Sequence, residues 1–242
     1  MKRFLSAFIA LVGLAWGVEM LSATGAVASA PGNPWAVREH ALTLTGLGSF
    51  ALMSLAMVLA TRPARLERFF GGMDRIYRVH KWAGILAVGF AVLHWLVELS
   101  DDLIKTLWGR EGRLPKDHGG GLLEAMRDVA EELGEFAIYA LLAMLVLTLW
   151  KRFPFRIWRY VHKGMPVLYL ALAFHAAFLA PLDYWTQPVG VLLASLIVAG
   201  GVASVRVLAG RIGQDLVDGG DHDRHGVRGG GRERQFLFQQ PA

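Results

Sequence analysis

Four histidines lie inside apolar stretches of the sequence, where ionisable side chains are costly and usually serve a function. One stretch holds His80 and His94, and another holds His162 and His175. His80 and His94 are 14 residues apart, which is a rise of about 21 Å along a helix at about 1.5 Å per residue. Fourteen steps of about 100° return to within about 40° of the starting direction, so both imidazoles should face one way at two depths.

The second stretch repeats this arrangement with one difference. His162 and His175 are 13 residues apart, which again spans about 20 Å but leaves the imidazoles about 140° apart on an ideal helix. We therefore expect a bend, an unwound turn or a bulge between them. Gly164 and Pro166 lie in that interval, and proline removes an intrahelical hydrogen bond and kinks helices.

The histidines belong to apolar stretches of about 20 residues. This is the length of helix that crosses a bilayer core of about 30 Å. The 242-residue chain is 54% hydrophobic, with a mean hydropathy of +0.40. Backbone groups in lipid must be satisfied internally, so the sequence predicts an all-α membrane protein with six transmembrane helices. The stretches are 4–22, 41–61, 77–99, 135–152, 158–180 and 188–208.

Basic residues gather at alternate joints between these stretches. The joints 62–78 and 151–163 are rich in Arg and Lys, whereas 23–40 has only Arg38 and 181–187 has neither. The positive-inside rule then places both termini in the cytoplasm. The same clustering beside a lipid bilayer accounts for the net charge of +5 and the pI of about 9.7 without nucleic-acid binding.

With this topology the two histidine stretches run parallel. His80 then matches His162 in depth, and His94 matches His175. Two histidines from facing helices at one depth can hold a haem iron from both sides. The chain has no cysteine, which excludes iron–sulfur clusters, thiolate-ligated haem and covalent haem attachment.

A zinc or copper transporter is the alternative that uses the same imidazoles. Such a transporter would be expected to add carboxylates within the spans. Glu19 and Glu98 lie near span ends, and neither histidine stretch holds a carboxylate at its middle. The pattern therefore favours haem ligation over transport.

The remaining segments divide the chain into three parts. Residues 1–40 are predicted to form a first transmembrane helix or a cleaved signal peptide, followed by an outer loop. Residues 41–210 are predicted to form a transmembrane haem domain, and residues 211–242 a disordered cytoplasmic tail. Within the outer segment 100–134, apolar residues at helical spacing over 121–134 predict a short amphipathic helix on the outer membrane face.

Three motifs around the histidines resemble the ferric reductase-like transmembrane superfamily, most closely its bacterial NADPH-oxidase-like members. The likeness covers about residues 40–208 and implies an oxidoreductase haem subunit in a bacterial inner membrane. The motifs are L-A-T-R-P-A-R-L-E-R-F-F at 59–70, I-Y-R-V-H-K-W at 76–82 and W-R-Y-V-H-K-G-M-P-V-L-Y-L at 158–170.

The resemblance implies two b-type haems, an inner one on His80 and His162 and an outer one on His94 and His175. In that superfamily electrons from NAD(P)H pass through FAD in a cytoplasmic domain, cross the membrane through the haems and reach ferric iron or dioxygen. Four basic residues beside the inner pair are predicted either to bind the haem propionates or to anchor the helices at the membrane surface. They are Arg78, Lys81, Arg159 and Lys163.

The sequence departs from the full oxidase pattern because no flavin motif and no Gly-x-Gly-x-x-Gly motif are present. Too few residues follow the last apolar stretch for a flavin and a nicotinamide domain. FAD and NAD(P)H are therefore expected to act only through a partner, a cytoplasmic flavoprotein reductase domain, and a quinone is the alternative electron donor. A truncated gene product is the other explanation of the missing domains. A haem subunit that delivers electrons to a periplasmic reductase is the alternative of the same class.

Overall fold

The computed structural model describes residues 2–22, 33–111, 113, 120–150 and 152–210, and this part of the chain is built from helices. Four of these helices, α2, α4, α5 and α8, are long and apolar enough to cross a membrane. The helices are α1 (Lys2–Ser22), α2 (Pro34–Ala60), α3 (Ala64–Phe70), α4 (Met73–Trp108), α5 (Leu122–Leu149), α6 (Phe155–His162), α7 (Met165–Leu179), the 3-10 helix η1 (Leu182–Thr186) and α8 (Pro188–Leu208).

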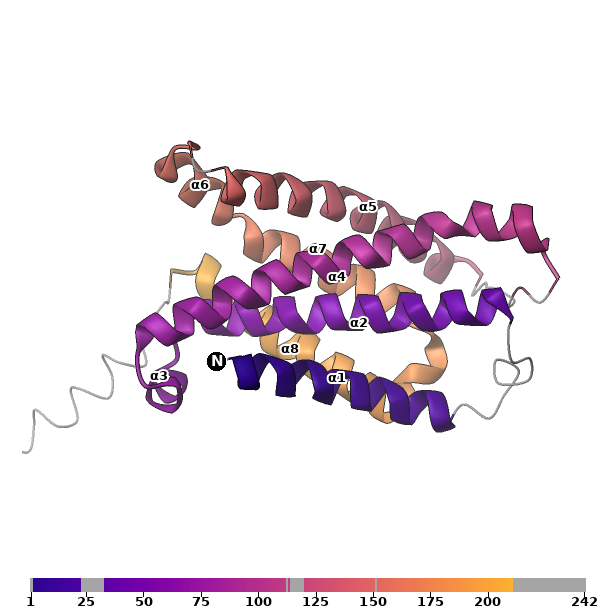
Figure 1. The fold of residues 1–242 in the computed structure, drawn as a ribbon, viewed down its shortest axis with the longest axis horizontal. Helices are drawn as coiled ribbons and strands as arrows, with labels where there is room; N and C mark the ends of the chain where they lie inside the picture. Colours follow the sequence, from indigo (N-terminus) through magenta and orange to yellow (C-terminus); the bar gives the residue numbers. More distant parts are fainter. Residues whose placement is uncertain (1, 23–32, 112, 114–119, 151, 211–242) are drawn as a thin grey trace, which may run out of the picture.

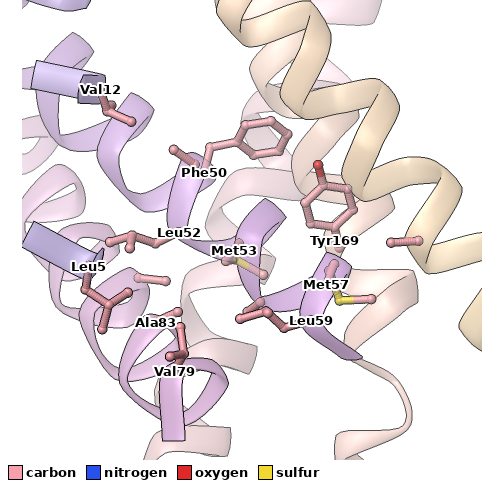
Figure 2. Packing of buried hydrophobic residues seen from close by; sticks show 14 of the residues in the cluster. Leu5, Val12, Phe50, Leu52, Met53, Met57, Leu59, Val79, Ala83 and Tyr169 are labelled. Carbon is pink, nitrogen blue, oxygen red and sulfur yellow. The ribbon is translucent and has the colours of Figure 1, made fainter. Parts of the chain in front are cut away.

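Helix α2 forms the centre of the bundle (Figure 1). It packs on α4, α8 and α1, while α7 packs on α5 and α8. Close to its middle α2 buries a continuous run of side chains, and Figure 2 shows several of them facing α1, α4 and α7. Burial of this apolar surface holds the helices on either side of α2 in fixed positions. The labelled members on α2 are Phe50, Leu52, Met53, Met57 and Leu59.

Local sequence signals fix the starts of α2 and α4, the two helices that pack against each other most extensively. The Asn33 side chain accepts a hydrogen bond of 3.0 Å from the Trp35 amide, and Pro34 occupies the first turn of α2. Both features favour a helix start. Gly71 and Gly72 have positive φ angles of 71° and 126° and make the corner between α3 and α4. Residues with a Cβ rarely adopt such angles, so this corner depends on glycine.

The second histidine stretch is broken, as the 13-residue spacing predicts. Helix α6 ends at His162 and α7 begins at Met165. Pro166 has no amide hydrogen and cannot donate to the carbonyl of His162 four residues earlier, so a continuous helix would lose that bond. The prediction of a distortion near Gly164 and Pro166 is confirmed.

Two other predictions about the elements are corrected by the structure. Residues 121–134 do not form a separate surface helix, because α5 runs without interruption from Leu122 to Leu149. Its apolar positions continue at helical spacing through Gly134, which is a weak helix breaker and does not end the helix. Helix α4 also extends to Trp108, well past the expected end at residue 99.

The number of candidate spans is smaller than the six apolar stretches. The apolar part of α1 covers only Arg3–Val18, and α7 has 15 residues, both shorter than a typical transmembrane helix. Within the described ranges, four helices meet the length and hydropathy of a span. The chain is thus a multi-pass, helical membrane protein. Residues 23–32 and the tail 211–242 lie outside the described residues. Residues 23–32 include the small residues Ala28, Ser29 and Ala30, after which a signal peptide would be cleaved.

Candidate haem site

The four histidines form two facing pairs. His80 on α4 and His162 at the end of α6 have ring centroids 6.1 Å apart, with an angle of 81° between the ring planes. His94 on α4 and His175 on α7 have centroids 6.5 Å apart and an angle of 85°. We call these the first pair and the second pair. They are the pairs that the depth argument predicts.

Both α4 histidines are oriented by backbone carbonyls of α2. Nδ1 of His80 donates a hydrogen bond of 3.0 Å to the Ala56 carbonyl, and Nδ1 of His94 donates one of 3.0 Å to the Leu42 carbonyl. A carbonyl can only accept, so Nδ1 carries the proton and a neutral ring keeps Nε2 as an acceptor. Ala56 and Leu42 are 14 residues apart on α2, the same spacing as His80 and His94 on α4. The antiparallel packing of the two helices therefore brings each histidine to an α2 carbonyl in the same register.

His175 is held in the same way from α5. Its Nδ1 donates a hydrogen bond of 2.7 Å to the Ala130 carbonyl. Gly134 lies four residues after Ala130, and a Cβ at Gly134 would come within 2.3 Å of the His175 ring. The absence of a side chain at this position therefore lets the imidazole reach the carbonyl.

A glycine also lies beneath the other ring of the second pair. Gly46 follows Leu42 by four residues, and a Cβ there would come within 3.1 Å of the His94 ring. Sequence reasoning missed both glycines as site residues. The only signal is a glycine inside an apolar helix, and a single sequence does not show which partner it faces.

His162 differs from the other three histidines. Its Nδ1 is buried and has no hydrogen-bond partner within the described residues. Instead the ring stacks on Trp158 of the same helix, with centroids 4.8 Å apart and planes 14° apart. The Trp158 indole nitrogen donates a hydrogen bond of 2.9 Å to the Thr148 hydroxyl on α5.

The distance between the rings fits two imidazoles on opposite sides of one metal ion. Metal–imidazole bonds are about 2.0–2.1 Å long, so the two nitrogens would be about 4 Å apart and the ring centroids about 6 Å apart. Both observed centroid distances, 6.1 and 6.5 Å, agree with this value. In the part of the chain that is described, Nε2 of each histidine makes no hydrogen bond and is available as a ligand.

The donor set matches haem rather than a bare metal ion. Metal-ligating histidines ordinarily donate their other ring nitrogen to a carbonyl or carboxylate, as three of these four do. Haem needs only two protein ligands, whereas a zinc site takes three or four. Across the described ranges no three His, Asp or Glu side chains gather to hold a metal ion.

The four predicted propionate partners flank the first pair. All four side chains are exposed and lie within three residues of His80 or His162. Lys163 places its ammonium group 5.5 Å from the centre of the Tyr160 ring. Their contact with propionates stays a prediction. The residues are Arg78, Lys81, Arg159 and Lys163.

The segment of α7 between the two pairs is anchored by Tyr169. This side chain is fully buried and stacks on Phe50, with ring centroids 5.3 Å apart. Its hydroxyl lies 2.9 Å from the Ser54 hydroxyl and donates a hydrogen bond of 2.8 Å to the Leu196 carbonyl. Figure 2 shows Tyr169 beside the buried α2 side chains. Its hydroxyl is therefore engaged in packing α7 against α2 and α8.

A cluster of ion pairs joins α2 and α4 at the end of the bundle near the second pair. It was not predicted from the sequence. Arg38 of α2 binds the Glu98 carboxylate at 2.9 Å and the Glu98 carbonyl at 3.1 Å. Asp101 pairs with Lys105 and, at 3.2 Å, with Arg113. These contacts hold the start of α2 against the long C-terminal extension of α4.

A comparison with known families agrees with the geometry of the site. The family model described as ferric reductase like transmembrane component matches residues 45–173, more than half of the chain. This range includes His80, His94 and His162, and His175 lies two residues beyond it. No curated protein is significantly similar, so the likeness to bacterial NADPH-oxidase-like members stays a prediction. The chain belongs to the ferric reductase-like transmembrane family.

Proposed function

We propose that this chain carries electrons across a membrane through two b-type haems, each held by one histidine pair. The observation that carries the proposal is the geometry of the pairs. Two rings face each other at 6.1 Å in the first pair and 6.5 Å in the second. Three of the four rings donate Nδ1 to a carbonyl, which leaves Nε2 as the ring nitrogen that can act as a ligand.

The two pairs suit electron transfer across a membrane because they lie at two depths, so that an electron could cross in two shorter transfers. The 14 residues between His80 and His94 correspond to about 21 Å along α4, and an apolar core of about 30 Å has room for two layers. Each haem would supply one-electron redox chemistry. The protein supplies ligands in a fixed tautomer, a fixed ring orientation and an apolar surrounding that sets the potential.

A haem held by both histidines of a pair would keep no position for a substrate on its iron. His94 and His175 would then hold the haem nearest the acceptor, and the chemistry supplied there would be one-electron transfer without binding of the acceptor to the metal. This supports an oxidoreductase role in which the chain passes electrons and does not transform a bound substrate.

The charge distribution supports a direction for this transfer. His80 lies in the first part of α4 and His162 at the end of α6. Figure 1 shows α3, the start of α4 and α6 at one end of the bundle, and the basic joints 62–78 and 151–163 belong to this end. By the positive-inside rule this end faces the cytoplasm of a bacterial inner membrane, with both termini on that side. The donor is then a cytoplasmic flavoprotein or a quinone. The acceptor is ferric iron, dioxygen or a periplasmic reductase.

A reduced-minus-oxidised absorbance spectrum of the purified full chain tests this proposal. We expect the bands of b-type haem and two haems per chain. Absence of haem from protein purified with an ample haem supply would refute the proposal. Uptake of zinc or copper into vesicles by haem-free protein, abolished in His94→Ala, would favour a transporter instead.

A further inference from the structure

His162 is the one ligand of the proposed site that the backbone does not orient. It is the last residue of α6, directly before the break at Lys163 and Gly164. Its Nδ1 is buried without a hydrogen-bond partner among the described residues, whereas the other three histidines each donate to a carbonyl. A ligand at a helix break with no hydrogen bond needs another constraint.

Trp158 provides that constraint through a parallel stack. Residues four apart on a helix are neighbours, and the indole of Trp158 lies against the His162 ring with centroids 4.8 Å apart and planes only 14° apart. Phe155 also stacks on the indole, with centroids 5.6 Å apart and planes 22° apart. The ring of His162 therefore rests on a stack of two aromatic side chains from its own helix.

A second contact fixes the indole in place. Its Nε1 donates a hydrogen bond of 2.9 Å to the Thr148 hydroxyl, near the end of α5. Thr148 in turn donates to the Met144 carbonyl at 2.7 Å, so its lone pairs are directed by α5. The tether joins α6 to the neighbouring helix and sets the rotation of the Trp158 ring.

We infer that Trp158, tethered by Thr148, is a positioning residue that orients His162 toward His80 and keeps water from its Nδ1. The inference rests on the proposed function. A ring without an Nδ1 hydrogen bond is a less basic ligand than one that donates to a carbonyl. The stack therefore also makes His162 the weakest electron donor of the four ligands and raises the potential of the haem at the first pair.

Three variants separate the two contacts. Trp158→Leu removes the stack and the tether, Trp158→Phe keeps an aromatic ring without the tether, and Thr148→Val removes the hydroxyl from a side chain of similar size. Trp150→Leu is the matched control, because Trp150 is an exposed tryptophan at the end of α5 whose ring contact is with Phe153. All variants are made in the full chain.

The measurements are haem content, the electron paramagnetic resonance signals of the two ferric sites and a redox titration. In Trp158→Leu we expect the affinity of the first pair for haem to fall about 10-fold or more, as when an outer partner of a metal ligand is removed. The potential of the haem that remains there should shift downward, because water reaches Nδ1. Trp158→Phe and Thr148→Val both keep an aromatic ring without the tether, so each should give an intermediate loss of haem. Trp150→Leu and the second pair should be unchanged.

Two results would overturn the inference. One is a Trp158→Leu protein with two haems and an unchanged signal and potential at the first pair. The other is an equal loss at both pairs, which would indicate general unfolding. If Trp158→Leu does not fold, Thr148→Val with unaltered haem content and potential still refutes the tether. Failure of the proposed function itself is distinct, because the unmodified chain would then contain no haem.

Discussion

The two histidine pairs are alike in geometry and unlike in how they are supported. In the second pair both rings donate to carbonyls of neighbouring helices, and each lies over a glycine. In the first pair only His80 has a carbonyl partner, and His162 rests on an indole at a helix break. The second pair is thus held by backbone, and the first pair depends partly on side chains.

This difference indicates which substitutions each pair can tolerate. A carbonyl cannot be removed by mutation, but its approach can be blocked, so the weak points of the second pair are Gly46 and Gly134. An indole can be removed, so the weak point of the first pair is Trp158. The two sites should therefore fail independently and by different substitutions.

Loss of a ligand should have the largest effect. His80→Ala should remove the haem at the first pair and leave the other, and His175→Ala should do the reverse, because one axial ligand holds haem much more weakly than two. Haem per chain, measured as the pyridine haemochrome, should fall from two to one in each variant. His40→Ala is the control, since His40 faces Trp16 and not another histidine. Two haems retained in His175→Ala would contradict the assignment.

Blocking the carbonyl should come next and should distinguish the two glycines. In Gly134→Ala the methyl would lie 2.3 Å from the His175 ring, so that ring must move and the second haem should be lost. In Gly46→Ala the separation is 3.1 Å, so we expect a smaller decrease in haem affinity, about 10-fold.

Gly89→Ala is the control for both glycine variants, because nothing lies within 4 Å of a Cβ at Gly89 in the described structure. It should keep both haems and gain about 0.5–1 kcal/mol of helix stability. Reduced-minus-oxidised spectra and haem titration measure all three proteins. Equal haem affinity in Gly134→Ala and the unmodified chain would exclude the docking role of this glycine.

Removal of the Tyr169 hydroxyl should weaken the fold slightly without changing either histidine pair. Tyr169→Phe loses the contacts with Ser54 and Leu196, and should lower the free energy of unfolding by about 1 kcal/mol. Haem content should not change, since Tyr169 packs α7 against its neighbours. Thermal unfolding in detergent measures the effect, with the exposed Tyr77→Phe as control. Selective loss of one haem would show that Tyr169 serves a single site.

The smallest effect is expected from the exposed basic residues beside the first pair. Arg159→Gln with Lys163→Gln should lower haem affinity there a few-fold and lower its potential, because positive charge near a propionate favours the reduced haem. High salt should diminish the effect. Arg65→Gln with Arg68→Gln, on α3, is the control. No difference between the two double variants would mean that Arg159 and Lys163 act only as membrane anchors.

Periodicity made the histidine pairing predictable from sequence. Spacing and helix phase predicted which rings meet, and the misfit of 13 residues predicted the break before α7. The continuity of α5 was harder to predict, because the predicted amphipathic helix ended at residue 134 and the next apolar stretch began at 135. Helix α5 instead runs through Gly134, which lies against the His175 ring.

The support of each ring was not predictable from a single sequence. The carbonyls of Leu42, Ala56 and Ala130 belong to ordinary apolar residues whose side chains carry no signal. Only the register of α2 on α4 and of α5 on α7 brings these carbonyls to the imidazoles. Trp158 stood four residues before His162, but its stacking depends on the path of α6 and on Thr148.

The most direct test of the paired arrangement compares two double variants of the full chain. His94→Ala with His175→Ala removes both ligands of one pair, and His94→Ala with His162→Ala removes one ligand from each. Haem per chain, measured in both purified proteins, should be one in the first variant and none in the second. Equal haem content in the two proteins, or one intact haem in the second, would contradict the pairing of His80 with His162 and of His94 with His175.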